Sequence, residues 1–149
     1  MNKGIWFFGF PGSGKTYASR YLKKKIVNAF LIDGDFVRKF ISTDLGYKIK
    51  DRKIQTKRLL GLAKLTLKNN LFPIISSSYL GRQVGTQAQK LGIKVIFVKR
   101  DRSLLKKKIL KKQNVFGKDI KIEKFKFIIY ENDIFYKKKL DKLIKNLKK

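Results

Sequence analysis

The segment GFPGSGKTY, residues 9–17, constrains the fold of this chain more than any other stretch. It fits the phosphate-binding loop (P-loop) pattern of a glycine, four residues, and then Gly-Lys-Thr. An apolar run over residues 4–8 precedes the loop, and helically spaced apolar residues follow it. Strand, loop and helix therefore come in the order that the motif requires, which favours a nucleoside triphosphate site over a chance glycine-rich turn.

Each part of this loop has a physical reason. Glycines let successive backbone N–H groups converge on a phosphate, and the following helix presents its positive N-terminus. Lys15 can reach the β- and γ-phosphates, and the Thr16 hydroxyl can bind Mg²⁺. The residues predicted to bind the nucleotide and its metal are Gly9, Gly12, Ser13, Gly14, Lys15 and Thr16.

Strand-like and helix-like segments alternate along the chain. Apolar runs typical of buried strands occur at residues 4–8, 30–32, 72–75, 94–98 and 127–130. Helical patterns occur after the P-loop, after residue 79, and at residues 51–70, 101–113 and 135–149, the last with a stripe expected to face the core. We therefore expect one domain over residues 1–149: an α/β, three-layer fold of the P-loop NTPase type, with a five-stranded parallel sheet covered by helices on both faces.

Three polar segments follow the predicted strands. Ligands of parallel sheets collect at the carboxyl ends of the strands, which places residues 9–16, 33–35 and 76–79 around one cleft. Asp33 and Asp35 leave the second strand beside the bound phosphates. A carboxylate there can hold Mg²⁺ through water or accept a proton from an attacking hydroxyl. A simple Asp-Gly-Asp turn is the alternative interpretation.

Composition limits the chemistry and the partners. The chain has no cysteine and no histidine, so acid–base chemistry must come from carboxylates, lysines or tyrosines. Lys and Arg number 38 against 10 Asp and Glu, a formal net charge of +28. This charge fits either a nucleic-acid binder or a lysine-rich enzyme with anionic ligands. Lysine outnumbers arginine and is spread through the predicted helices, which favours the enzyme.

Targeting signals are not evident in the sequence. The first predicted strand begins at residue 4, which leaves no room for a signal peptide, and no apolar run approaches the ~20 residues that span a bilayer. We expect a cytoplasmic protein with no membrane partner and no specific nucleic-acid partner.

The segment after the second predicted strand resembles the adenylylsulfate kinase family. In that family a P-loop is followed by Asp-Gly-Asp-x-x-Arg, then Asp-Leu-Gly-Phe, and shortly afterwards Asp-Arg. This chain has the corresponding residues in the same order, at 33–38, 44–47 and 51–52, with Arg58 following. The resemblance covers residues 4–80 and is weaker over residues 93–133, where Gly-Lys-Asp-Ile at 117–120 is similar to a family segment.

The resemblance implies an ATP-dependent kinase of sulfate assimilation, with an alcohol group as acceptor. With ATP and Mg²⁺, such a kinase transfers the γ-phosphoryl group to the 3′-hydroxyl of adenylylsulfate. Lys15 and Asp33 are the implied catalytic residues, Asp33 acting as base or metal organiser. The implied substrate-binding residues are Asp35, Arg38, Tyr47, Arg52, Gln55 and Ser77. In this scheme the two arginines hold the anionic group and the tyrosine stacks on the base.

The sequence departs from the family around the acceptor and the lid. Gln55 replaces an asparagine, and Ser-Ser-Ser-Tyr at 76–79 replaces Ile-Ser-Pro. The lid motif, Arg-Asp followed by Lys-Gly-Leu-Tyr, is missing, and we expect the basic segment 106–112 to close over ATP instead. Val115 stands where a second stacking aromatic is expected, with Phe116 next to it.

These departures leave the acceptor open. One alternative is a kinase of a cytidine diphosphate derivative, such as the cytidine diphosphoramidate of capsule decoration. Another, from a different class, is a P-loop protein whose binding to nucleic acid is regulated by nucleotide. The expected partner is a small-molecule nucleotide, and both a monomer and a homodimer are consistent with the sequence.

Overall fold

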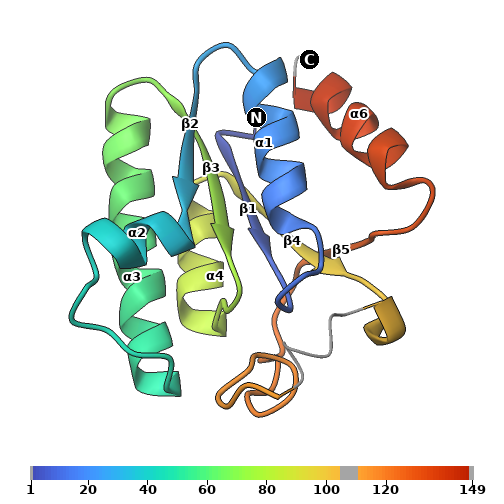
Figure 1. Ribbon diagram of the computed structural model, residues 1–149. Coiled ribbons are helices and arrows are strands. Elements are labelled where there is room, and N and C mark those ends of the chain that lie inside the picture. The colour runs from blue at the N-terminus through green and yellow to red at the C-terminus, as the bar shows by residue number, and fades with distance from the viewer. Residues whose placement is uncertain (1, 105–110, 148–149) are drawn as a thin grey trace.

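Five parallel strands form the central sheet of the computed structural model, which describes residues 2–104 and 111–147 (Figure 1). The strands are β1 (Gly4–Phe8), β2 (Ala29–Asp33), β3 (Phe72–Ser77), β4 (Ile93–Lys99) and β5 (Ile128–Glu131). Their order in the sheet is β2-β3-β1-β4-β5, and all four pairings are parallel. The predicted five-stranded parallel sheet is confirmed.

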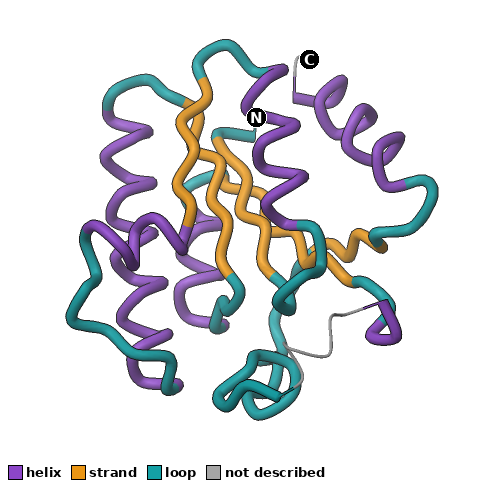
Figure 2. The backbone as a smooth tube through the Cα atoms, viewed as in Figure 1, coloured by secondary structure: helices purple, strands orange, loops and turns teal. Residues whose placement is uncertain are grey.

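Helices cover both faces of this sheet, as predicted. They are α1 (Lys15–Lys25), α2 (Gly34–Phe40), α3 (Ile49–Lys68), α4 (Arg82–Lys90), α6 (Tyr136–Leu147) and the short 3₁₀ helix η1 (Arg102–Leu104). Figure 1 shows α1 and α6 on one face and α2, α3 and α4 on the other. Figure 2 shows that most of residues 111–127 form loops near the carboxyl ends of the strands.

The central strand β1 explains why two separate cores form. All five of its residues are buried, between β3 and β4. Because successive side chains of a strand point to opposite faces, Trp6 and Phe8 pack with α3 and α4. Ile5 and Phe7 pack with α1 and α6 on the other side. The P-loop therefore leaves the sheet from its most completely buried strand.

The C-terminal helix α6 uses its apolar stripe as predicted. Its buried residues are Tyr136, Leu140, Leu143 and Ile144, which belong to the same core cluster as Ala18 and Leu22 of α1. The Tyr21 hydroxyl donates a hydrogen bond of 2.6 Å to Asp141, which also links the two helices. Among the described residues, no helix has the length and apolar character needed to cross a membrane.

The helix predicted over residues 101–113 is wrong where the structure describes it. Only η1 is helical there, and residues 111–114 form a turn and bends; residues 105–110 lie outside the described part. Residues 111–113 carry no apolar side chain that could be buried, and the next residue, Asn114, has a φ of 54°, which no right-handed helix contains. A second difference is Phe30, which is 50% exposed because β2 is an edge strand.

Candidate active site

A cleft of about 520 Å³ lies at the carboxyl ends of the strands, where the sequence predicts it. It collects side chains from the P-loop, from the start of α2, from α3 and from the residues after β3. The predicted site residues that line it are Gly12, Lys15, Thr16, Asp33, Asp35, Arg38, Tyr47, Arg52, Gln55 and Ser77. Gly9, Ser13 and Gly14 belong to the P-loop but do not line this cleft.

Glycine is needed at two P-loop positions for a steric reason. Gly9 has a φ of 153° and Gly14 a φ of 105°, conformations that other residues rarely adopt. A side chain at Gly9 would collide with the carbonyl oxygen of Val98, and one at Gly14 with the side chain of Asn132. The loop is therefore pressed closely against the ends of the neighbouring strands.

Lys15 is the cation of the loop. Its Nζ donates to the Phe10 carbonyl at 2.8 Å and lies 3.5 Å from the Ser13 Oγ. Burial lowers the pKa of Lys15 to about 8, against the opposing attraction of Asp35 and Asp33. A bound phosphate would stabilise the charged form of this buried lysine, because the anion replaces the solvation that burial removes.

Asp33 and Asp35 mark the start of α2. The Asp33 side chain caps this helix, with its Oδ1 accepting from the Asp35 backbone N–H at 2.9 Å. The segment is therefore a helix N-terminus and not the isolated turn considered as an alternative. Asp33 is 9% exposed and shares the cleft with Asp35 and Thr16.

These oxygen-bearing side chains fit a magnesium ion. Two carboxylates and the Thr16 hydroxyl line the cleft next to the P-loop, and Mg²⁺ prefers oxygen ligands. Within residues 2–104 and 111–147, no three acidic, histidine or cysteine side chains form a cluster. The donor set therefore suits an ion that is bound mostly through phosphates and water, as Mg²⁺ commonly is, and not one enclosed by protein ligands.

Arg52 is the most buried cation on the acceptor side, at 5% exposure. Its guanidinium donates to the Tyr47 carbonyl at 2.9 Å, to the Ser78 hydroxyl at 2.8 Å and to the Asn114 carbonyl at 2.7 Å. All three partners are neutral. Burial, together with the nearby charge of Arg38, lowers the pKa of Arg52. The side chain thus brings a buried positive charge to the cleft wall.

Tyr47 lies within reach of both predicted acceptor arginines. The guanidinium carbon of Arg38 is 4.6 Å from the centre of its ring, and that of Arg52 is 5.7 Å away. Arg38 also donates to the Gly46 carbonyl at 2.7 Å, which holds the loop that carries the tyrosine. The ring is 58% exposed. An aromatic surface beside two cations suits a base joined to an anionic group.

Arg58 behaves differently from Arg38 and Arg52. It forms a two-pronged ion pair with Asp44, with distances of 2.6 and 2.8 Å, on the exposed surface. It does not line the cleft. Arg58 therefore only braces this segment, whereas Arg38 and Arg52 hold its backbone and also line the cleft.

Gln55 and Ser77 face the cleft with different capacities. The Gln55 Nε2 donates to the Gly34 carbonyl at 3.1 Å, while its Oε1 is buried without a partner. The Ser77 hydroxyl accepts from the indole of Trp6 at 2.8 Å and donates to the Tyr79 carbonyl at 2.8 Å. Gln55 thus has a free acceptor for a ligand, whereas the proton of Ser77 is already used within the protein.

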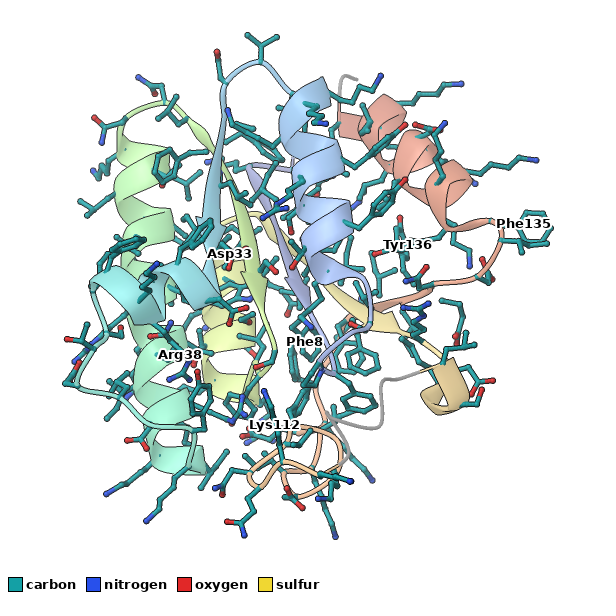
Figure 3. All side chains as sticks on the ribbon, in the orientation of Figure 1. Phe8, Asp33, Arg38, Lys112, Phe135 and Tyr136 are labelled. Atoms are coloured by element: carbon teal, nitrogen blue, oxygen red, sulfur yellow. The ribbon has the colours of Figure 1, made fainter. Side chains whose placement is uncertain are left out.

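The segment after the undescribed residues forms another wall of the cleft. Lys112 and Val115 line it together with Asp33 and Arg38, and Figure 3 shows Lys112 below the ends of the strands. Phe116 is 1% exposed and packs in the core. Of the two candidates for a second stacking residue, only Val115 therefore faces the cleft. The expected lid lysines 106–110 lie outside the described residues.

Some site residues could not be anticipated from motifs. Ser78 and Asn114 hold Arg52; the sequence predicts the segment 76–79 at the cleft, but nothing in it indicates this contact of Ser78, and Asn114 belongs to no recognised pattern. Side chains from the ends of β4 and β5 also contact the P-loop. Ligands gather at the carboxyl ends of parallel strands. Applied to the fourth and fifth strands, this rule predicts the contacts from the ends of β4 and β5.

Known proteins resemble this chain in sequence. A family model described as adenylylsulphate kinase matches residues 1–125. An adenylyl-sulfate kinase of Buchnera aphidicola subsp. Acyrthosiphon pisum is 32% identical over 76 residues, which are 48% of this chain and 37% of that protein. One from Clostridium acetobutylicum is 38% identical over 65 residues, 41% of this chain and 32% of that protein. The matched segments are thus well under half of either relative.

The fold also has a counterpart among solved structures. The Mycobacterium tuberculosis APS kinase CysC, solved in complex with AMPPNP and APS, superposes with a TM-score of 0.80. The alignment covers 99% of this chain and 98% of that chain, at 21% sequence identity. At this level of identity the likeness establishes the fold.

Proposed function

This chain belongs to the adenylylsulfate kinase family, and from that membership we propose that it is an ATP-dependent kinase of a small nucleotide. The proposed reaction transfers the γ-phosphoryl group of ATP to the 3′-hydroxyl of an acceptor such as adenylylsulfate. One observation carries the proposal: a single cleft contains the P-loop lysine, two carboxylates, and an aromatic ring beside two guanidinium groups. In this proposal, the donor and the acceptor would share one cleft.

On the donor side, the P-loop would hold the phosphates of ATP. Lys15 would exchange the Phe10 carbonyl for phosphate oxygens and regain charge compensation there. Thr16, Asp33 and Asp35 would hold Mg²⁺, directly or through water. When bound, this ion neutralises charge on the β- and γ-phosphates.

Asp33 would act on the acceptor hydroxyl. Its Oδ1 already accepts from the Asp35 N–H, which leaves Oδ2 to orient the hydroxyl and receive its proton. As the acceptor oxygen bonds to the γ-phosphorus, the bond between that phosphorus and the bridging oxygen of ADP breaks. Lys15 faces the negative charge that shifts to this region.

The acceptor would lie against Tyr47, with its anionic group toward Arg38 and Arg52. The unpartnered Oε1 of Gln55 favours an acceptor that offers an N–H or O–H donor. The amino group of adenine meets this requirement, and that of cytosine meets it as well. A cytidine diphosphate derivative is therefore the second candidate acceptor, supported by the presence of Val115 where the family has a second aromatic.

The test is an acceptor screen with ATP and Mg²⁺ that measures ADP release. Adenylylsulfate, cytidine diphosphate derivatives and plain nucleosides are the arms, and the Lys15→Ala variant is the matched control. We expect ADP release that depends on one anionic nucleotide and disappears in the variant. Failure of every acceptor, together with nucleotide-dependent duplex binding that survives moderate salt, would identify a nucleic-acid-binding protein instead.

We also propose that residues 1–149 act as one kinase domain, because all described strands join one sheet.

A homodimer is a further proposal. It is supported by the exposed side chains Phe36, Phe40 and Ile41, at 53%, 71% and 54% exposure, which a subunit contact would cover. Light scattering at several concentrations tests it, and a constant monomer mass would contradict it.

A further inference from the structure

Side chains from beyond the fifth strand hold the P-loop from outside. The Asn132 Nδ2 donates to the Ser13 carbonyl at 2.8 Å, and the Tyr136 hydroxyl donates to the Gly14 carbonyl at 3.2 Å. Figure 3 places Tyr136 beside α1 at the start of α6, with Phe135 pointing outward. Both donors follow residue 125, where the match to the family model ends.

A third donor comes from the end of β4. The Arg100 Nη1 donates to the Gly12 carbonyl at 3.2 Å. The N–H of the same peptide unit belongs to Ser13, and it donates to the Phe10 carbonyl at 3.1 Å. Arg100 therefore supports a peptide that closes the turn of the loop, whereas Asn132 and Tyr136 hold the two peptides that follow.

The planarity of the peptide bond gives these two contacts a consequence. In a trans peptide the carbonyl and the next N–H point in opposite directions. Fixing the Ser13 carbonyl outward turns the Gly14 N–H inward. The Gly14 carbonyl also accepts from the Ala18 N–H at 3.1 Å, at the start of α1, so the Tyr136 hydroxyl is a second donor to it and helps to orient the Lys15 N–H. These N–H groups belong to the set that a P-loop directs at phosphate.

The loop needs such support because of its glycines. Gly12 has a φ of 79° and Gly14 a φ of 105°, and glycine moves among many such conformations at little cost. An unsupported loop would have to be ordered when the nucleotide binds, and the ordering would lower the affinity. Hydrogen-bond donors on its outer side hold the loop in one conformation before the nucleotide binds.

We propose that Asn132 and Tyr136 are positioning residues for the nucleotide. They hold the Ser13 and Gly14 carbonyls so that the following N–H groups face the phosphates, and the C-terminal segment of the chain thereby completes the donor site. The inference rests on the proposed function only in taking a nucleoside phosphate as the P-loop ligand. The competing interpretation is that both residues simply attach α6 to the body of the protein, as the buried Tyr136 ring does.

The experiment measures the affinity for Mg·ADP by calorimetry, without any acceptor. Tyr136→Phe removes only the hydroxyl, and Asn132→Leu replaces the amide with an apolar side chain of similar size. Tyr21→Phe is the matched control, because it removes a hydrogen bond between α1 and α6 and leaves the P-loop carbonyls untouched. Loss of one hydrogen bond should weaken Mg·ADP binding roughly two- to tenfold in each of the first two variants.

The control should bind Mg·ADP like the wild type. In turnover assays the two test variants should raise the KM for ATP and leave the KM for the acceptor unchanged, at an unfolding midpoint close to that of the control. Wild-type affinity in both test variants would overturn the proposal, and so would an equal loss in Tyr21→Phe, which would indicate attachment of α6 alone. Should one variant fail to fold, the other decides.

The outcome is separable from that of the acceptor screen. If the wild type binds Mg·ADP but phosphorylates no acceptor, the proposed kinase function fails while the role of Asn132 and Tyr136 is still measured. If the wild type does not bind Mg·ADP, the positioning role is overturned as well.

Discussion

Replacing Lys15 with methionine should stabilise the protein without nucleotide and abolish its binding of ATP. Burial lowers the pKa of Lys15 from 10.5 to about 8, so keeping this side chain charged at neutral pH costs folding free energy. The difference corresponds to about 3 kcal/mol at about 1.4 kcal/mol for each pKa unit. The variant also loses the hydrogen bond to the Phe10 carbonyl, which offsets about 1 kcal/mol of this gain. The expected gain is about 2 kcal/mol at pH 7, which raises the unfolding midpoint by roughly 5 °C for a chain of this size.

The pH dependence distinguishes this charge effect from a packing effect. Between about pH 8 and pH 10.5 the folded wild type has lost the Lys15 proton while the unfolded chain still holds it. Unfolding then takes up a proton, so the free energy of unfolding of the wild type rises with pH through this window. The variant lacks the Lys15 amine, so its free energy of unfolding does not rise in this way. Its advantage should therefore be full below pH 8 and should disappear as the pH approaches 10.5.

Urea unfolding of both proteins at pH 7 and pH 10 measures these differences. Lys24→Met is the matched control, because Lys24 is an exposed lysine of the same helix. Its effect should be small and the same at both pH values. The reasoning is refuted if Lys15→Met destabilises the protein at pH 7, or if its gain is equal at pH 7 and pH 10.

Three further substitutions test the cleft. Asp33→Asn should lower kcat at least ~10²-fold and change ATP binding much less; if Asp35→Asn is inactive instead, the proton acceptor is the other carboxylate. Arg52→Lys keeps the charge, but one ammonium cannot replace three fixed donors, so the acceptor KM should rise roughly ten- to hundredfold at constant ATP KM. A parallel loss for both substrates with a lower unfolding midpoint would show that this arginine only braces the loop. Arg58→Ala should leave turnover and urea stability nearly unchanged, because its ion pair with Asp44 is exposed.

The parts of the fold that could be predicted are those fixed by local pattern. The buried apolar runs of β1 and β3 and the apolar stripe of α6 follow from side-chain pattern, which acts over a few residues. The start of α2 was harder, because Asp-Gly-Asp suits a turn and a helix cap equally well. The helix predicted over residues 101–113 fails at its described C-terminal end, where residues 111–113 carry only polar side chains.

The site residues divide in the same way. The arrangement of Arg38 and Tyr47 agrees with a family spacing that spans only a short segment. The contacts of Asn132 and Tyr136 with the P-loop depend on β4 lying next to β1 and on β5 lying next to β4. Strand order is decided by the packing of the whole sheet, and no local pattern of the sequence records it. The pairing of Arg58 with Asp44 likewise depends on the path of a whole loop.

The charge of the cleft has an origin separate from the net charge of the chain. The exposed Arg58 has an acidic partner, Asp44, and remains in contact with water. Arg52 is 5% exposed, its hydrogen-bond partners are neutral, and the other nearby cation, Arg38, adds repulsion that lowers its pKa further. Lys15, on the opposite side of the same cleft, is also buried, and the charges of Asp35 and Asp33 offset only part of the cost. A buried cation whose charge is not fully compensated carries an unfavourable free energy that an anion relieves on binding. Neutralising the surface lysines would weaken non-specific attraction to polyanions but would leave this local requirement intact, so the preference of the cleft for anionic ligands follows from the burial of these two side chains.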